Sequence, residues 1–159
     1  MSLPVLADVP DGVDESSWLA ACSAVRGHCG WHVAPSVTET LTLDGPGGDV
    51  LHLPSQRVTA VASVISDGTA VANPEWSADG MVRTSGRWSR KFRGVAVDLT
   101  HGYDECPEEV LTVLRGMVAA DGRGGVQSVT SGAHQVRYDP ALSDSHRAIL
   151  DRYRIEPLP

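Results

Sequence analysis

The sequence predicts an α+β fold: a small bundle of three helices with an inserted block of antiparallel β-hairpins and sheet, and a projecting β arm. Two observations lead to this prediction. Helical periodicity is confined to residues 15–32, to the segment after Pro107 and to the segment after Ser143, whereas residues 36–100 show the alternation and turns of short strands. Helices and strands are therefore segregated along the chain, and this order does not build a parallel sheet.

The first helix is expected over residues 15–32, after a Pro- and Gly-punctuated segment, 1–13, that we expect to be flexible. Asp14 is a suitable N-cap for this helix. Glycines weaken its last turn, and Pro35 ends it at the latest. The apolar residues that recur at helical spacing are Trp18, Cys22, Val25 and Cys29.

Residues 36–100 are expected to form the β block, inserted between the helices. Asp-Gly pairs and other turn sequences separate its short apolar runs, and Asp-Gly between such runs favours a hairpin because both central residues of a type I′ turn need positive φ. The predicted strands are Val37–Leu43, Val50–Leu53, Val58–Ser66, Thr69–Val71, Met81–Thr84 and Phe92–Thr100.

A second helix is expected after Pro107, which suits the first helical position, with acidic residues next to it that complement the helix N-terminus. The Asp-Gly pair at 121–122 is expected to end this helix. After a Gly-rich linker, residues 126–138 are interpreted as an extended arm or hairpin. Ser143 then caps a last helix, and residues 155–159 form a Pro-rich tail.

The composition restricts the possible functions. A chain of 159 residues is large enough to bury a core as one domain, which we place at 14–154. Its net charge of −7 argues against sequence-independent binding of DNA or of an anionic membrane. We expect no secretory signal and no bilayer-spanning run of roughly 20 apolar residues. With three cysteines, reduced thiols in a cytosolic setting are the default.

The best candidate for a metal site comprises Cys22, His28, Cys29 and His32. These residue types suit zinc, and a helix would bring some of them together. The spacing, however, lacks the C-x2-C pair of a known zinc finger. In the alternative interpretation, which we favour, the cysteines are small core residues and the histidines face solvent.

A catalytic thiol is a second candidate. Cys106 lies just before the helix that starts at Pro107, where a helix dipole lowers a thiol pKa, and His101 is a possible base. The alternative is that His101 and Tyr103 pack at a junction between sheet and helix. Because the sequence contains no P-loop, no G-x-S-x-G and no H-E-x-x-H, we predict that the chain is not an enzyme and has no cofactor or metal.

A basic cluster lies between residues 83 and 93, interleaved with Trp88 and Phe92. Cations mixed with aromatic residues are typical of nucleic-acid contacts, but they can also meet an acidic protein surface. A solvated hairpin with Trp88 packed on the sheet is the third possibility. The overall acidity disfavours a DNA contact.

Several passages together resemble head–tail connector (adaptor) proteins of long-tailed, siphophage-type bacteriophages, particularly those of actinobacterial hosts. In VAVDLTHGYDECPEEV, residues 95–110, an alternating strand runs into a Thr-His-Gly-Tyr corner, an acidic linker and a Pro-initiated helix. Other passages also match the family: the run at 51–64, the VISDG and EWS segments, the pattern at 128–138 and the closing LSDSHRAILDRYR at 142–154. The N-terminal segment departs from the family, in which a longer acidic helix often comes first.

The resemblance implies a virion structural protein that assembles as a ring, dodecameric in the family, between the portal protein and a downstream stopper or tail protein. DNA would pass through its axial channel without sequence-specific binding, and no membrane is involved. The protein would be made in the host cytoplasm and reside in the virion neck. Two alternatives are another neck or tail protein, such as a tail terminator, and a small cytosolic cysteine enzyme.

The resemblance also guides our choice of contact residues, because a ring requires two different faces of each subunit to meet. For the contact between subunits we select the basic hairpin and the arm: Arg83, Arg87, Trp88, Arg90, Lys91, Arg93, Val129, Val136 and Tyr138. For the portal contact the family implies the last helix and tail: Arg147, Arg152, Tyr153, Arg154 and Ile155. The structural corner comprises His101, Gly102, Tyr103 and Pro107.

Overall fold

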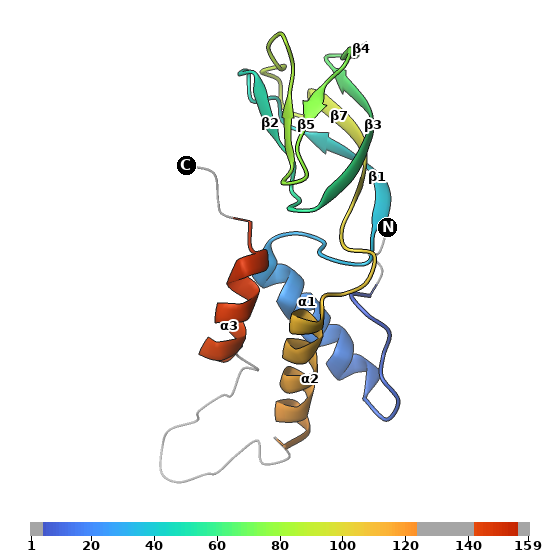
Figure 1. Ribbon diagram of the computed structural model, residues 1–159, viewed down its shortest axis with the longest axis vertical. Helices are drawn as coiled ribbons and strands as arrows, with labels where there is room; N and C mark the ends of the chain where they lie inside the picture. The colour runs from blue at the N-terminus through green and yellow to red at the C-terminus, as the bar shows by residue number, and fades with distance from the viewer. Residues whose placement is uncertain (1–4, 124–141, 156–159) are drawn as a thin grey trace.

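The computed structural model describes residues 5–123 and 142–155. The molecule is elongated, with the strands at one end and the helices at the other (Figure 1). The predicted arm at 126–138, with the contact residues Val129, Val136 and Tyr138, lies outside the described residues, as do most of the tail and residues 1–4. Three helices and antiparallel sheets confirm the predicted α+β class.

The helices are α1 (Glu15–Cys29), α2 (Glu108–Arg123) and α3 (Asp144–Leu150), and the 3-10 turn η1 (Asp151–Tyr153) follows α3 directly. The predicted caps form: Asp14 accepts a hydrogen bond from the Ser17 amide, and Ser143 accepts one from the His146 amide. Two predicted ends are wrong. Helix α1 stops at Cys29 because Gly30 takes φ 77°, and α2 continues through the Asp-Gly pair to Arg123. The glycine at position 122 does not end α2, because a glycine inside a helix costs only about 1 kcal/mol.

A hydrophobic cluster joins the three helices to the segment before α1. Helix α1 contacts both α2 and α3, and α2 also contacts α3. The buried side chains of this helical core include Leu6, Trp18, Val25, Trp31, Val33, Val110, Leu114 and Leu150. Within the described residues no helix has the length and apolar character needed to cross a membrane.

The strands form two antiparallel sheets. The four-stranded sheet has the order β1 (Val37–Leu43), β7 (Val95–His101), β3 (Val58–Ser66), β4 (Thr69–Ala70). The three-stranded sheet has the order β2 (Val50–His52), β6 (Met81–Arg83), β5 (Glu75–Trp76). The bounds of β1 and β3 agree with the prediction, because β1 alternates at period two and both strands are rich in β-branched residues.

Strand β7 begins at Val95 rather than at Phe92, which corrects the prediction. Arg93 has φ 54°, a left-handed conformation that no strand residue adopts, and its amide donates to Asp44 Oδ1 at 2.7 Å. Residues 84–94 therefore form a loop between β6 and β7, and the basic segment is not a hairpin.

A second hydrophobic cluster lies between the two sheets. It takes Leu51 and Val82 from the three-stranded sheet, and Val64, Val97 and Leu99 from the four-stranded sheet. None of the described residues in this β core belongs to the helical core. The β block is therefore a small sandwich with an interior of its own.

Candidate functional site

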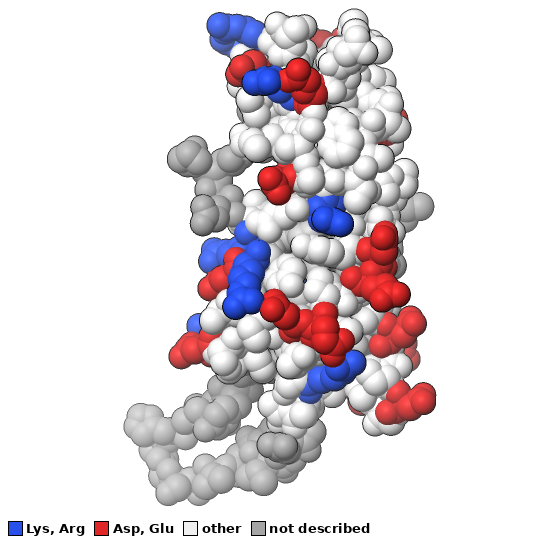
Figure 2. Space-filling model, viewed as in Figure 1, with Lys and Arg blue, Asp and Glu red and all other residues white. Residues whose placement is uncertain are grey.

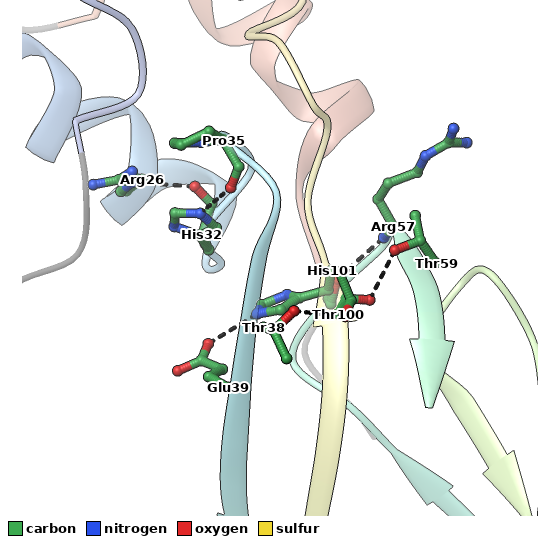
Figure 3. Close-up of polar contacts among 10 residues, drawn as sticks. Arg26, His32, Pro35, Thr38, Glu39, Arg57, Thr59, Thr100 and His101 are labelled. Atoms are coloured by element: carbon green, nitrogen blue, oxygen red, sulfur yellow. Dashed lines mark hydrogen bonds and ion pairs between the residues drawn. The ribbon is translucent and has the colours of Figure 1, made fainter. Parts of the chain in front are cut away.

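The corner between β7 and α2 joins the sandwich to the helices (Figure 3). His101 is buried at the end of β7, and its Nε2 lies 2.8 Å from Glu39 Oε1 on β1. Gly102 follows with φ 101°, and its amide donates to Arg57 O at 2.8 Å. A Cβ at this position would lie 3.0 Å from Pro35 O, so the turn fits only glycine without a shift.

Tyr103 continues the corner into the helical half. Its amide donates to Val33 O at 2.8 Å, and its ring packs against Trp31 and Tyr153 with centroid distances of 6.3 and 6.0 Å. The Arg57 guanidinium lies 5.3 Å from the Tyr103 ring centroid. Aromatic and cationic contacts therefore tie the corner both to the helices and to the start of β3.

His32 lies beside His101 in this corner, with ring centroids 5.7 Å apart. Its Nε2 is 2.5 Å from Pro35 O, and neither histidine's Nδ1 has a hydrogen-bond partner among the described residues. Because His32 is buried, the expectation that it faces solvent is wrong. Burial is the main cause that lowers the pKa of His32 below 6.5, with smaller contributions from nearby Arg26 and His101.

The lowered pKa of His32 predicts a loss of stability in mild acid. The unfolded chain binds a proton at this residue near pH 6.5, whereas the folded chain resists it. The contribution of His32 is therefore complete above pH 6.5 and declines as the pH falls toward its lower folded pKa. Urea unfolding between pH 8 and pH 5 measures this slope. The His32→Gln variant should flatten the slope, whereas His52→Gln, at an exposed position of β2, should leave it unchanged.

The predicted metal candidate does not assemble. Cys22 and Cys29 are free thiols inside the helical core, in agreement with the alternative interpretation. The Nε2 atom of His28 lies 2.8 Å from Asp151 Oδ1, and His32 belongs to the corner. Across residues 5–123 and 142–155, no group of three or more His, Cys, Asp or Glu side chains is placed to hold a metal ion.

Cys106 is half-buried and lies before α2, but its environment opposes a reactive thiol. Desolvation by burial, helped by the nearby Cys22 and Glu108, raises the pKa of Cys106 to about 12. His101, the candidate base, has its Nε2 directed to Glu39 instead. The thiol is therefore protonated at neutral pH and is a poor nucleophile.

Cys106 should react slowly with iodoacetamide in the folded protein. A pKa of about 12 in place of 9.0 lowers the thiolate fraction near neutral pH by about a thousandfold. Mass spectrometry of the alkylated protein, followed over time at pH 7.5, measures the rate. Cys106→Ser should leave the far-UV spectrum and any assembly of the protein unchanged. Rapid modification of native Cys106 would contradict this description of the site.

The basic cluster divides into paired and unpaired cations. Arg83 lies 2.6 Å from Glu75 Oε2, and Lys91 lies 3.2 Å from Asp67 Oδ1. The side chains of Arg87, Arg90 and Arg93 are exposed and have no ion-pair partner in the described part of the chain.

Two aromatic residues of this loop differ in their positions. Trp88 is 3% exposed and donates from Nε1 to Asp49 O at 2.9 Å, so it belongs to the β core and offers no surface to a neighbour. Its selection as a contact residue was wrong for that reason. Phe92 is 88% exposed between the cations, and its interleaving with them is the sequence signal for a contact residue. We define the tip loop as residues 84–94.

A shallow hollow of about 460 Å³ lies beside the tip loop. Its lining includes Arg87, Trp88 and Arg90 of the tip loop together with Asp67 and Val71. This lining contains no histidine or cysteine that could act as a base or nucleophile.

The C-terminal segment contacts the helices of its own chain. The Arg152 Nη1 atom lies 3.0 Å from Glu109 Oε1, and the Tyr153 hydroxyl donates to Glu109 Oε2 at 3.3 Å. Trp31 Nε1 donates to Tyr153 O at 2.6 Å, and the Ile155 amide donates to Cys29 O at 2.9 Å. Tyr153 and Ile155 are thus partly buried, whereas Arg147, Arg152 and Arg154 are exposed.

A scan against protein-family models and a search of curated proteins found no match. Solved structures, in contrast, show the same architecture. A chain in the neck of the native GTA particle computed with C12 symmetry has a TM-score of 0.60 and 20% sequence identity, and the alignment covers 99% of this protein and 97% of that chain. The chain has the fold of that neck component.

Two further structures agree. One is a chain from the virion of the native gene transfer agent (GTA) particle, with a TM-score of 0.55, 19% identity, and 98% and 86% coverage of the two chains. The other comes from the neck of the empty GTA particle computed with C6 symmetry, with a TM-score of 0.53, 18% identity, and 90% and 77% coverage. The fold thus occurs in neck and virion components of a phage-like particle.

Proposed function

We propose that this protein is a structural component of the neck of a phage-like particle, where it acts as a head–tail connector. The observation that supports this most strongly is the fold shared with a neck component over nearly the whole of both chains. The resemblance of the HGY corner and the closing helix to phage connectors is independent support, because it rests on local sequence rather than on overall architecture.

In this proposal, copies of the protein form a ring on the portal and present their other end to a stopper or tail protein. The C12 symmetry used for the similar neck supports a ring of twelve copies. The channel would pass DNA without gripping it, because a subunit with a net charge of −7 has no surplus of cations for the phosphates. The protein would be made in the host cytoplasm and incorporated into the virion neck.

The exposed groups suggest how each end is used. Exposed Arg87, Arg90 and Arg93 lie close in sequence to the exposed Phe92 on the tip loop, so this end suits an acidic partner surface with a pocket for an aromatic ring. At the other end, Asp and Glu side chains are spread over the helical half of the molecule (Figure 2). We assign the exposed Arg147, Arg152 and Arg154 to the portal contact, and the segment at 126–138 to contact between copies.

A second candidate is another ring protein of the same neck, such as a tail terminator. The similar neck computed with C6 symmetry favours this alternative, because a terminator ring is expected to be hexameric. The number of copies per particle distinguishes the two functions.

Particles made without this polypeptide test the proposal. We expect DNA-filled heads that leak their DNA and carry no tails in negative-stain images. Resupplying the chain should restore tailed particles, and the mass of the released neck should give twelve copies per particle. Intact, infectious particles made without the polypeptide would overturn the proposal, and six copies would favour the terminator.

A further inference from the structure

The outer surface of the four-stranded sheet has an unusual composition, and we call it face A. Its side chains lie in rows across β1, β7 and β3. The central row is Thr40, Asp98 and Ser63, and the row nearest the tip is Thr42, Ala96 and Ile65. The alternating burial of β1 and β7 directs these residues away from the β core. Asp98 is the only ionisable residue in these two rows.

The polar groups of face A are paired with one another. Both Thr40 and Ser63 donate their hydroxyls to Asp98, the latter at 2.5 Å, and these two hydrogen bonds lower the pKa of Asp98. In the row nearest the corner, the hydroxyls of Thr38 and Thr100 are 2.8 Å apart. A neighbouring molecule could cover this surface without leaving these groups unpaired, because their partners lie within the face.

Face A is also poor in charged side chains. A soluble protein's surface is usually about a quarter to a third Lys, Arg, Glu and Asp, whereas face A has short, neutral side chains around one carboxylate. Short side chains lose little rotamer entropy when they are covered. Ile65 is 41% exposed here, a large apolar side chain at the edge of an otherwise flat surface.

The opposite side of the sandwich carries a different surface, which we call face B. It is the outer surface of the three-stranded sheet, where Met81 on β6 is 44% exposed beside His52 on β2. The two charges next to Met81, Arg83 and Glu75, form an ion pair with each other. Trp76, at the edge strand β5, is 41% exposed, but it pairs with the buried Val82 and so lies on the inner side of this sheet, outside face B.

The placement of the two faces matches what a ring requires. Cyclic assembly joins one surface of each copy to a different surface of the next, and the two surfaces must lie on opposite sides of the subunit. Faces A and B belong to the two sheets of one sandwich, so they lie on opposite sides of the β core and at the same end of the long axis (Figure 1).

We propose that face A of one copy packs on face B of the next copy, so that neighbouring sandwiches stack side by side around the ring. This inference rests on the proposed function. In the contact, Met81 of one copy buries apolar surface against the short side chains and Ile65 of its neighbour. In this contact Arg83 and Glu75 neutralise each other, and the Asp98 carboxylate keeps its hydrogen bonds from Thr40 and Ser63.

Three variants of the full-length protein test the inference. Thr42→Arg places a charge on face A, and Met81→Arg places one on face B, both at exposed positions that should not disturb folding. Ala119→Arg adds the same charge at an exposed position of α2 and is the matched control. Circular dichroism verifies that each variant is folded. Sedimentation velocity and native mass spectrometry then measure self-association over a dilution series up to the solubility limit.

We expect the wild-type protein and Ala119→Arg to self-associate, and each face variant to weaken that association at least about tenfold. An equimolar mixture of Thr42→Arg and Met81→Arg should form dimers and nothing larger. The reason is that the intact face B of the first variant can meet the intact face A of the second, while the two outward faces are blocked. This mixing result is specific to a contact between two different faces.

The inference is overturned if the wild-type protein stays monomeric at every concentration, if both face variants associate like wild type, or if Ala119→Arg weakens association as much as they do. The proposed function is tested separately by incorporation into particles. Normal incorporation of Thr42→Arg and Met81→Arg would refute the contact between faces and leave the connector function standing. Absence of the wild-type chain from the particles would refute the function.

Discussion

Replacing Trp18 with alanine should lower the free energy of unfolding by about 3–5 kcal/mol, the usual cost of removing a buried Trp or Phe side chain. Trp18 is 1% exposed in the helical core, and its Nε1 donates to Ala7 O at 2.9 Å. The substitution therefore leaves a cavity between α1 and the segment before it, and also an unpaired carbonyl. Urea unfolding followed by circular dichroism measures the loss.

Leu19→Ala is the control for Trp18→Ala, because Leu19 neighbours Trp18 on α1 but is one of the exposed large apolar residues. We expect this change to alter the unfolding free energy by no more than about 0.5 kcal/mol. Equal losses for the two variants would contradict the packing described for the helical core.

Gly80→Ala should destabilise the β sandwich by at least about 3 kcal/mol, because backbone strain and a steric clash add at the same residue. Gly80 has φ +85°, and a Cβ there would lie 2.2 Å from Ser55 O and 3.1 Å from Leu53 O. Both contacts are with backbone atoms, which cannot rotate away. The Leu53 amide also donates to Gly80 O at 2.7 Å, so any shift breaks this hydrogen bond.

Gly68→Ala separates the two causes. Gly68 has φ +78°, close to that of Gly80, but nothing lies within 4 Å of an added Cβ. This variant should lose only the roughly 1–2 kcal/mol of a left-handed alanine. Thermal unfolding of both variants gives the comparison. A Gly80→Ala protein as stable as Gly68→Ala would show that the turn between β5 and β6 relaxes without cost.

The parts of the fold that are determined by residues adjacent in the sequence could be predicted. Strand β1 follows directly from its period-two pattern and β3 from its many β-branched residues, and Asp14 and Ser143 are caps recognisable from their side chains. Phe92 shows the limit of such patterns. As an apolar residue just before Val95 it fits a longer strand, but it is exposed because Arg93 turns the chain.

The candidate site was harder to predict, because its properties come from contacts between residues far apart in the sequence. The residues next to Arg83 and Lys91 in the sequence do not indicate that these cations pair with Glu75 and Asp67. The pairing leaves Arg87, Arg90 and Arg93 as the tip-loop cations without an ion-pair partner among the described residues. Face A likewise arises from the register that brings Thr40, Asp98 and Ser63 into one row. The alternating threonines at 38, 40 and 42 were a local sign of it, but they do not identify the partner strands.

The separation of the two hydrophobic cores has a mechanical consequence. Opening the helices does not by itself expose the interior of the sandwich, since the described residues of the two cores do not overlap. Hydrogen exchange should accordingly detect two sets of amides with different protection. In the proposed ring, a strain that opens the helical half of a subunit would therefore leave the packing inside the sandwiches intact.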